Sequence, residues 1–331
     1  MNEPEHGRPA ARSADLVELG DMDELLRQVD RLVADHDWGG LVDLRDRCRA
    51  ALRRGRQLWP VASQCEYRVA LQAPAEWAAT MVVEGAGQFA LGPLAEVVAQ
   101  GSTWNDLAPH SATGPLRSVL AHERVLRGED LTEVTDIAVE VPHRIQSWEP
   151  DYALAEYREF KADFPHPDLP VGEALELPPP PPTIEDPDAV NAFRSAVQPW
   201  TVQSNGRADM AAVEGTAEQA VAALGPRLVR WAPLQPAQAL AAVAWAGASG
   251  GAHGRRRGAA AGRVEAWWTA AVLTGLDDTW PVDPDEMGEA VGELRWFAWS
   301  RDEPATGWSL RLAVEDPTDG LAWAVSATDS A

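Results

Sequence analysis

Five consecutive prolines, Pro178 to Pro182, interrupt this chain of 331 residues. Proline has no backbone N–H and a fixed φ, so such a run can join neither a helix nor a central strand and favours an extended conformation. Further prolines lie on both sides, at Pro165, Pro167, Pro170 and Pro187. We therefore expect residues 165–188 to be a proline-rich linker, serving either as a spacer or as a ligand for an aromatic groove on a partner.

The linker separates two domains with different hydrophobic patterns, and residues 1–14 are expected to be a disordered tail. In the first domain, residues 15–164, Asp21 is a predicted N-cap, and apolar residues then recur at helical spacing. Further helices are predicted at 41–54, 60–69, 92–100, 103–109 and 115–127. Short amphipathic helices joined by glycine turns resemble the helix-pair solenoids of the HEAT and tetratricopeptide type over about 110 residues, without a fixed period. Residues 133–141 alternate imperfectly and predict a strand.

The second domain, residues 189–331, is expected to mix helices with an antiparallel sheet, which makes the fold class of the chain α+β. Residues 203–213 and 227–234 are strand-like, with a helix between them at 216–224. Near the end of the chain the apolar residues alternate with a period of two. The segments 293–299, 308–315 and 321–325 therefore predict an antiparallel meander with one face buried against helices.

The tryptophans of this meander separate into two sets. Trp296, Trp308 and Trp323 lie on the alternating apolar face and are expected in the core. Trp299 lies on the opposite face of its strand with Arg295 and Phe297, so it is the tryptophan whose exposure is to be tested.

Composition limits the classes of partner. The formal net charge is -23, and such a field repels the phosphates of nucleic acids and anionic membranes. Cys48 and Cys65 are the only cysteines, which excludes a disulfide scaffold and a four-cysteine zinc site. The opening residues have no apolar core of a secretory signal, and no apolar run reaches the roughly 20 residues that span a bilayer. We expect a cytoplasmic protein.

One glycine- and arginine-rich segment, residues 249–263, stands apart from this acidic background. Gly250, Gly254, Gly258 and Gly262 recur at every fourth position, and on a helix they would form a stripe without side chains. Each glycine costs a helix interior up to about 1 kcal/mol relative to alanine. We therefore predict that the helix breaks near Ser249–Gly254 and restarts at about Arg255; one continuous, closely packed helix is the alternative.

A helix that restarts at Arg255 would place free backbone N–H groups beside several guanidinium groups, which is the chemistry of an anion site. The alternative is a solvated face neutralised by acidic neighbours, with the arginine content itself set by GC-rich coding. A second basic group at 45–56 has the same two interpretations. The candidate binding residues are Ser249, Gly250, Gly251, His253, Gly254, Arg255, Arg256, Arg257 and Arg263.

Other motifs are incomplete. Gly247-Ala248-Ser249-Gly250-Gly251 matches the G-x-S-x-G pattern of a nucleophile elbow, but no histidine follows His253 to serve as the base. Asp283 and Asp285 resemble the start of a calcium loop, although a helix N-cap at Asp283 explains them better. The seven histidines lack metal-binding spacing. We predict no catalytic residue, no cofactor and no metal.

These observations lead to two hypotheses. The first is a non-enzymatic interaction or scaffold protein whose arginine patches receive the acidic surface of a protein partner. The second is a binding or enzymatic domain that holds a small phosphate- or carboxylate-bearing ligand at residues 249–263.

Overall fold

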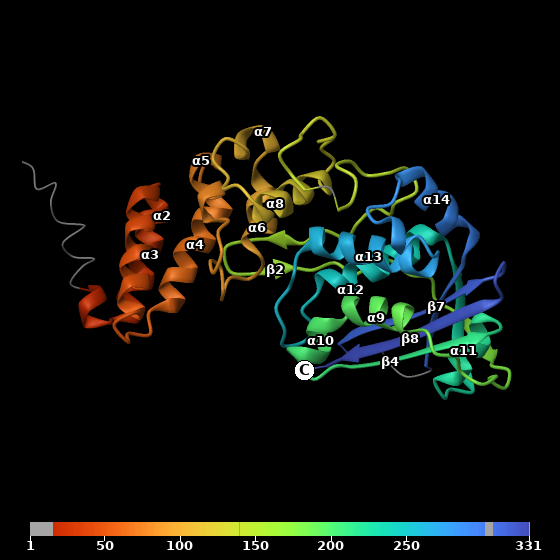
Figure 1. The fold of residues 1–331 in the computed structure, drawn as a ribbon. Coiled ribbons are helices and arrows are strands. Elements are labelled where there is room, and N and C mark those ends of the chain that lie inside the picture. Colours follow the sequence, from red (N-terminus) through yellow and green to blue (C-terminus); the bar gives the residue numbers. More distant parts are fainter. Residues whose placement is uncertain (1–15, 139, 302–306, 331) are drawn as a thin grey trace, which may run out of the picture. The chain divides into compact units, whose positions relative to one another are not determined.

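The protein is an α+β protein in a computed structural model that describes residues 16–138, 140–301 and 307–330 (Figure 1). The chain forms two compact units. The first consists of Met1–Arg127 and Glu156–Asp163, and the second of Gly128–Ala155 and Phe164–Ala331. The predicted strand at 133–141 is wrong: the described residues there form turns and loop, and residue 139 lies outside the described residues. No helix in the described part of the chain is both long and apolar enough to cross a membrane.

The first unit is built from short helices, as the hydrophobic spacing predicts. The N-cap at Asp21 is confirmed, because its Oδ1 accepts the N–H of Glu24 at 3.1 Å. A two-stranded hairpin of β1 and β2 completes the unit, and the hydroxyl of Tyr157 in β1 donates to Glu96 at 2.6 Å. The helices are α2 (Met22–Ala34), α3 (Trp38–Leu52), α4 (Trp59–Gln72), α5 (Ala75–Ala78), α6 (Leu94–Gly101), α7 (Trp104–Leu107) and α8 (Pro115–Val125), with η1 (Ala79–Met81), and the strands are β1 (Glu156–Tyr157) and β2 (Ala162–Asp163).

The second unit contains an antiparallel sheet with the strand order β3-β5-β6-β7-β8-β4. The predicted meander is confirmed as β6, β7 and β8, and the predicted strand–helix–strand segment as β4, α11 (Ala217–Ala223) and β5. Its strands are β3 (Glu173–Glu176), β4 (Arg207–Glu214), β5 (Leu228–Leu234), β6 (Arg295–Ser300), β7 (Trp308–Asp316) and β8 (Leu321–Asp329).

The proline-rich segment is extended but is not a simple spacer. Within it, β3 pairs with β5 at one edge of the sheet, and Thr183 forms an isolated bridge with Val213 of β4 at the other edge. Extended backbone is what the prolines impose, and the neighbouring residues that retain an N–H can use that shape to pair with a strand.

Helices cover both faces of the sheet. One face packs against α9 (Pro187–Ala196), α12 (Pro236–Ala248), α13 (Ala259–Leu273) and α14 (Pro284–Glu293) around Trp267 and Trp296. The other packs against α11 (Ala217–Ala223), and this second core includes Trp299, which is only 3% exposed. Trp299 is therefore buried on the second face of the sheet. The period-two pattern reveals one covered face and cannot show that a short helix covers the other.

The predicted break in the glycine-rich segment is confirmed, since α12 ends at Ala248 and α13 begins at Ala259. The small-residue stripe is therefore divided between two helices that lie side by side (Figure 1). A Cβ atom on Gly262 of α13 would overlap the carbonyl oxygen of Ala244 in α12, and Gly247 is in close contact with Glu265. The glycines thus allow the two helix backbones to approach closely.

This close approach predicts that Gly262→Ala destabilises the second unit. Over-packing of this kind costs about 1–3 kcal/mol of unfolding free energy, because the two helices must move apart. A matched control is Gly292→Ala in α14, where an added Cβ meets nothing within 4 Å. That variant should gain up to about 1 kcal/mol from improved helix propensity. Urea unfolding followed by tryptophan fluorescence measures both, and equal effects would contradict the inferred contact.

Candidate functional site

The loop between α12 and α13, residues 249–258, is closed by its own backbone. The N–H groups of Arg257 and Gly258 both donate to the carbonyl oxygen of Ala248, at 2.8 and 3.3 Å. Gly258 has a φ of 100°, in the left-handed region that favours glycine, and it precedes the first residue of α13. The predicted restart at Arg255 is therefore wrong by four residues, because the chain first returns to the end of α12.

Several loop N–H groups that were expected to be unpaired donate hydrogen bonds to acceptors elsewhere in the chain. Ala252 N–H donates to Oδ2 of Asp329 at 2.6 Å, and Arg255 N–H donates to Oε1 of Gln203 at 3.0 Å. His253 N–H donates to Oγ of Ser204 at 3.1 Å. Asp329 is 2% exposed. Its carboxylate therefore occupies the place beside the loop where an anionic ligand was expected.

The loop glycines serve this closure. A Cβ on Gly250 would overlap the backbone of Gly254, and a Cβ on Gly251 would overlap the carboxylate of Asp329. Gly251 also has a φ of 71°, which few side chains tolerate. These glycines let the loop fold onto itself and onto β8, and they do not by themselves form a ligand cradle.

Ser249 lies in a setting that differs from the nucleophile elbow its motif resembles. Its Oγ accepts the N–H of Gly251 at 3.0 Å, which forms a local turn, and the residue is 5% exposed. A nucleophile elbow also needs a strand before the serine, whereas here Ser249 is the C-cap that follows helix α12. The histidine in the loop, His253, is exposed.

The first three arginines lie in three different environments. Arg255 is exposed. The guanidinium carbon of Arg256 lies 4.8 Å from the ring centre of Phe164, so this arginine stacks on an aromatic face. Arg257 forms an ion pair with Glu265 of α13 and donates to the carbonyl oxygen of Ser195 at 3.3 Å.

Arg263 differs from these three arginines because it is completely buried, with 0% exposure. Its Nε and Nη2 atoms donate to the two carboxylate oxygens of Glu149, both at 2.7 Å. It also donates to the carbonyl oxygens of Pro142 and Arg144, at 2.8 and 3.0 Å. With these acceptors occupying its guanidinium group inside the core, Arg263 is not available to an external ligand.

Glu149 is the centre of a buried polar cluster that the sequence does not reveal. Trp267 Nε1 and the hydroxyl of Tyr152 both donate to its Oε2, at 3.0 and 2.6 Å. Burial alone raises the pKa of Glu149, but the hydrogen bonds and charge of Arg263 outweigh it, so the pKa is lower than usual. Burial likewise raises the pKa of the Tyr152 hydroxyl, which stays protonated. The cluster holds residues 142–152 on α13.

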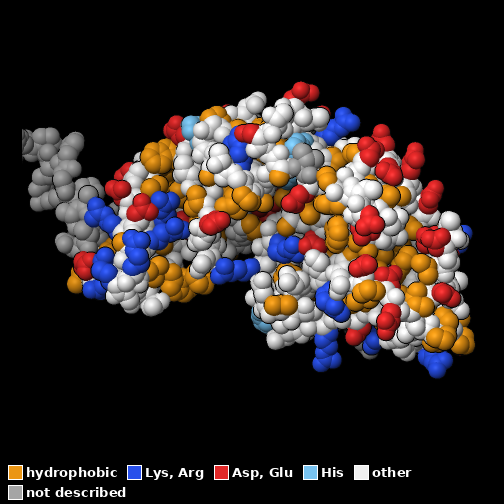
Figure 2. All heavy atoms as spheres, viewed as in Figure 1, with side chains coloured by type: hydrophobic (Ala, Val, Ile, Leu, Met, Phe, Trp, Pro, Cys, Tyr) orange, Lys and Arg blue, Asp and Glu red, His pale blue; other side chains and the backbone are white. Residues whose placement is uncertain are grey.

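The second basic group, at residues 45–56 in the first unit, is largely neutralised by neighbours. Arg49 forms an ion pair with the buried Glu66, Arg45 with Asp46 at 2.8 Å, and Arg54 with Glu18 at 2.7 Å. Figure 2 shows blue side chains gathered where α2 and α3 lie, with red ones among them. These arginines are therefore paired with carboxylates, one of which, Glu66, is buried.

Two further features concern the Asp283 motif and groups of possible metal ligands. The N-cap at Asp283 is confirmed by its bonds to the N–H groups of Asp285 and Glu286, at 3.0 and 3.2 Å. Within the described ranges, no three His, Cys, Asp or Glu side chains are grouped as a metal site would require.

A family of unknown function, DUF6183, matches residues 23–331. No curated protein and no solved structure matches the chain.

The buried ion pair predicts that Glu149→Gln is strongly destabilising. Removing one partner of a buried pair costs about 3–5 kcal/mol of unfolding free energy at pH 7, because Arg263 keeps its charge without compensation. The folded pKa of Glu149 is depressed, so its contribution is complete above the unfolded pKa and is lost as the pH falls through the folded pKa.

The stability difference between wild type and Glu149→Gln should therefore narrow below about pH 4, since the unfolded carboxyl titrates near there. Denaturant unfolding across a pH series measures this difference. The exposed Glu289 provides the control, and Glu289→Gln should change stability by less than about 0.5 kcal/mol. A constant gap over the whole pH range would contradict the assigned ion pair.

Proposed function

We propose that this chain, which belongs to the DUF6183 family, is a non-enzymatic interaction protein that receives an acidic segment of a protein partner. The proposed contact surface is the arginine ridge, defined here as Arg255, Arg256 and Phe164. The observation that carries the proposal is the stacking of Arg256 on Phe164 beside the exposed Arg255.

A stacked arginine suits the recognition of a carboxylate. The aromatic ring covers one face of a guanidinium group, whose N–H donors lie in its own plane. Phe164 is itself 40% exposed, so a partner could contact the ring and the charge together. Arginine and aromatic residues are the types that contribute most to protein–protein interfaces.

The rigidity of the loop supports the same proposal. Ala252 and Arg255 are fixed through their N–H groups to Asp329 and Gln203. A contact surface that is already ordered loses less conformational entropy when a partner binds. The loop therefore presents Arg255 and Arg256 at low entropic cost.

The alternative of a small phosphate or carboxylate ligand has less support. Such sites are concave and use converging donors, whereas the N–H groups of Ala252, His253 and Arg255 already have acceptors. The carboxylate of Asp329 beside them would repel a second anion. An exposed ridge fits a protein surface better than it fits a small molecule.

We also assign this function to the cytoplasm. Cys48 and Cys65 are free and buried, and thiols persist in reducing compartments. The net charge of -23 does not prevent binding of an acidic segment at contact range, because charges farther than about 8 Å are largely screened at physiological ionic strength.

The proposal predicts that an acidic peptide binds through the ridge. The probe is a fluorescein-labelled peptide in which glutamates alternate with aromatic residues, titrated with the full chain and followed by anisotropy. Arg255→Glu with Arg256→Glu should weaken binding by at least about tenfold, since each lost charge-assisted hydrogen bond contributes roughly 1.5–3 kcal/mol.

A matched control carries the same change of charge elsewhere on the second unit. Arg227 and Arg301 are both exposed, and Arg227→Glu with Arg301→Glu should leave the affinity within about twofold. Equal losses in the two double variants would show non-specific charge binding and contradict the ridge. Thermal stabilisation by inorganic phosphate that disappears in the Arg255/Arg256 variant would instead favour the small-ligand alternative.

A further inference from the structure

The proline run, defined here as Pro178 to Pro182, is held at both of its ends. Before the run, the N–H of Leu177 donates to the carbonyl oxygen of Arg227 at 2.8 Å, which continues the pairing of β3 with β5. After the run, the N–H of Ile184 donates to the carbonyl oxygen of Ala212 at 2.9 Å. The run is therefore a short segment between two fixed points of the second unit.

The sequence of the proline run restricts its backbone to one conformation. Each proline ring fixes φ at about −65°, and a residue that precedes a proline is confined largely to the extended region. The first four prolines of the run are each followed by another proline. The run therefore forms a polyproline II helix, which has about three residues per turn and no internal hydrogen bonds.

Most of the proline run faces the solvent. Pro181 is half-buried, and the other four prolines of the run are exposed. Because the helix has about three residues per turn, Pro179 and Pro182 lie on the same edge of it. These two exposed residues have the P-x-x-P spacing that aromatic-lined grooves recognise. The fold thus presents a proline ligand that is already in its binding conformation.

Acidic side chains flank the proline run on both sides. Glu176 precedes the run, Glu185 follows it, and both are exposed. Glu173, at the start of β3, is also exposed. Carboxylates at both ends of a docking segment attract a partner whose binding groove has lysine or arginine at its rim, and they repel an acidic partner. The flanking charges therefore indicate a partner with a basic rim.

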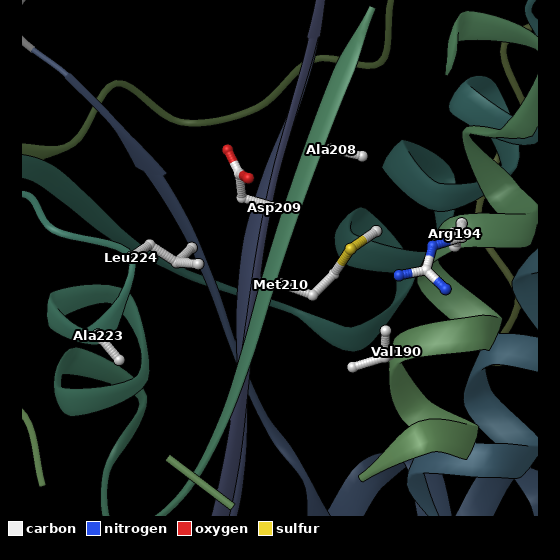
Figure 3. Close-up of a pocket in the computed structure, with 7 residues that line it drawn as sticks. All are labelled: Val190, Arg194, Ala208, Asp209, Met210, Ala223 and Leu224. Atoms are coloured by element: carbon white, nitrogen blue, oxygen red, sulfur yellow. The ribbon is translucent and has the colours of Figure 1, made fainter. Parts of the chain in front are cut away.

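The neighbouring strand β4 is closed to a partner strand at both ends of its outer side. The bond from Ile184 occupies one end, and at the other the N–H of Gly206 donates to the carbonyl oxygen of Trp200 at 2.9 Å. Figure 3 shows the groove between these ends, with Met210 on the side of α9 and Asp209 directed to the opposite side. Recognition of the proline run avoids this obstacle, because it uses side chains and shape and requires no ladder of backbone hydrogen bonds.

We propose that the proline run docks in an aromatic-lined groove of a protein partner whose rim is basic. The rings of Pro179 and Pro182 pack between the aromatic side chains of the groove, and the carboxylates of Glu176 and Glu185 face its rim. Because the run is ordered before binding, docking costs little conformational entropy. This surface is separate from the arginine ridge, since it uses other residues and binds a partner of different chemistry.

The test uses the full chain and three isolated proline-recognition domains, of the SH3, WW and EVH1 types, each chosen with basic residues beside its groove. The chain is titrated into each isotope-labelled domain, and the NMR signals of the aromatic residues in the groove report binding. At least one domain should bind the wild-type chain. Pro179→Ala with Pro182→Ala should weaken that binding by at least about tenfold, because the ring contacts and the fixed φ angles are both lost.

A matched control removes two prolines outside the run. Pro165 and Pro170 are both exposed, and Pro165→Ala with Pro170→Ala should leave the affinity within about twofold, because these positions are not in the docking segment. Thermal unfolding of both double variants should stay cooperative, since all four substituted prolines are exposed. Equal losses of affinity in the two variants would contradict the assigned segment.

The flanking charges provide an independent readout. Glu176→Lys with Glu185→Lys should weaken binding, and added salt should weaken binding of the wild-type chain, because salt screens the attraction to the basic rim. Arg255→Glu with Arg256→Glu should bind the domain as wild type does, which separates this surface from the arginine ridge. The proposal is overturned if none of the three domains binds at the highest attainable concentration, if the Pro179/Pro182 variant binds as tightly as wild type, or if reversing the flanking charges strengthens binding.

Discussion

The buried ion pair between Arg263 and Glu149 is the interaction on which the second unit depends. It joins a loop segment early in the unit to helix α13, two pieces of chain that are 114 residues apart. The pair is stable in the core because the remaining donors of Arg263 reach carbonyl oxygens and the remaining lone pairs of Glu149 accept from Trp267 and Tyr152. With α13 fixed by this pair, α12 packs on it through glycines, and the loop between them is closed.

The arginines of one short segment consequently have different roles. Arg263 belongs to the core, and Arg257 joins the loop to α13 through Glu265. Arg256 is stacked on Phe164, and Arg255 is exposed. Four positive charges that are grouped in the sequence therefore lie in different surroundings, because Arg263 is buried against Glu149 and Arg257 is paired with Glu265.

Much of the fold could be predicted from the sequence, because the relevant signals are local. The cap at Asp21, the meander of β6, β7 and β8, and the break after Ala248 each follow from spacing, turn residues or glycine content. The candidate site was predicted less well. The restart at Arg255 and the row of open N–H groups were wrong because Asp329, Gln203 and Ser204 supply acceptors from distant parts of the chain. The burial of Trp299 could not be predicted for a similar reason, since the alternating pattern of its strand does not show that α11 covers the second face of the sheet.

The sequence by itself determined the α+β class, the extended proline-rich segment and the division of the glycine stripe between two helices. These depend on backbone freedom and on the period of apolar residues, which act over a few positions. Tertiary structure alone decided which arginines stay at the surface, which carboxylate fills the loop and which strand lies at the edge of the sheet. Those outcomes depend on contacts between residues far apart in the chain, and no local pattern encodes the partner that each side chain meets.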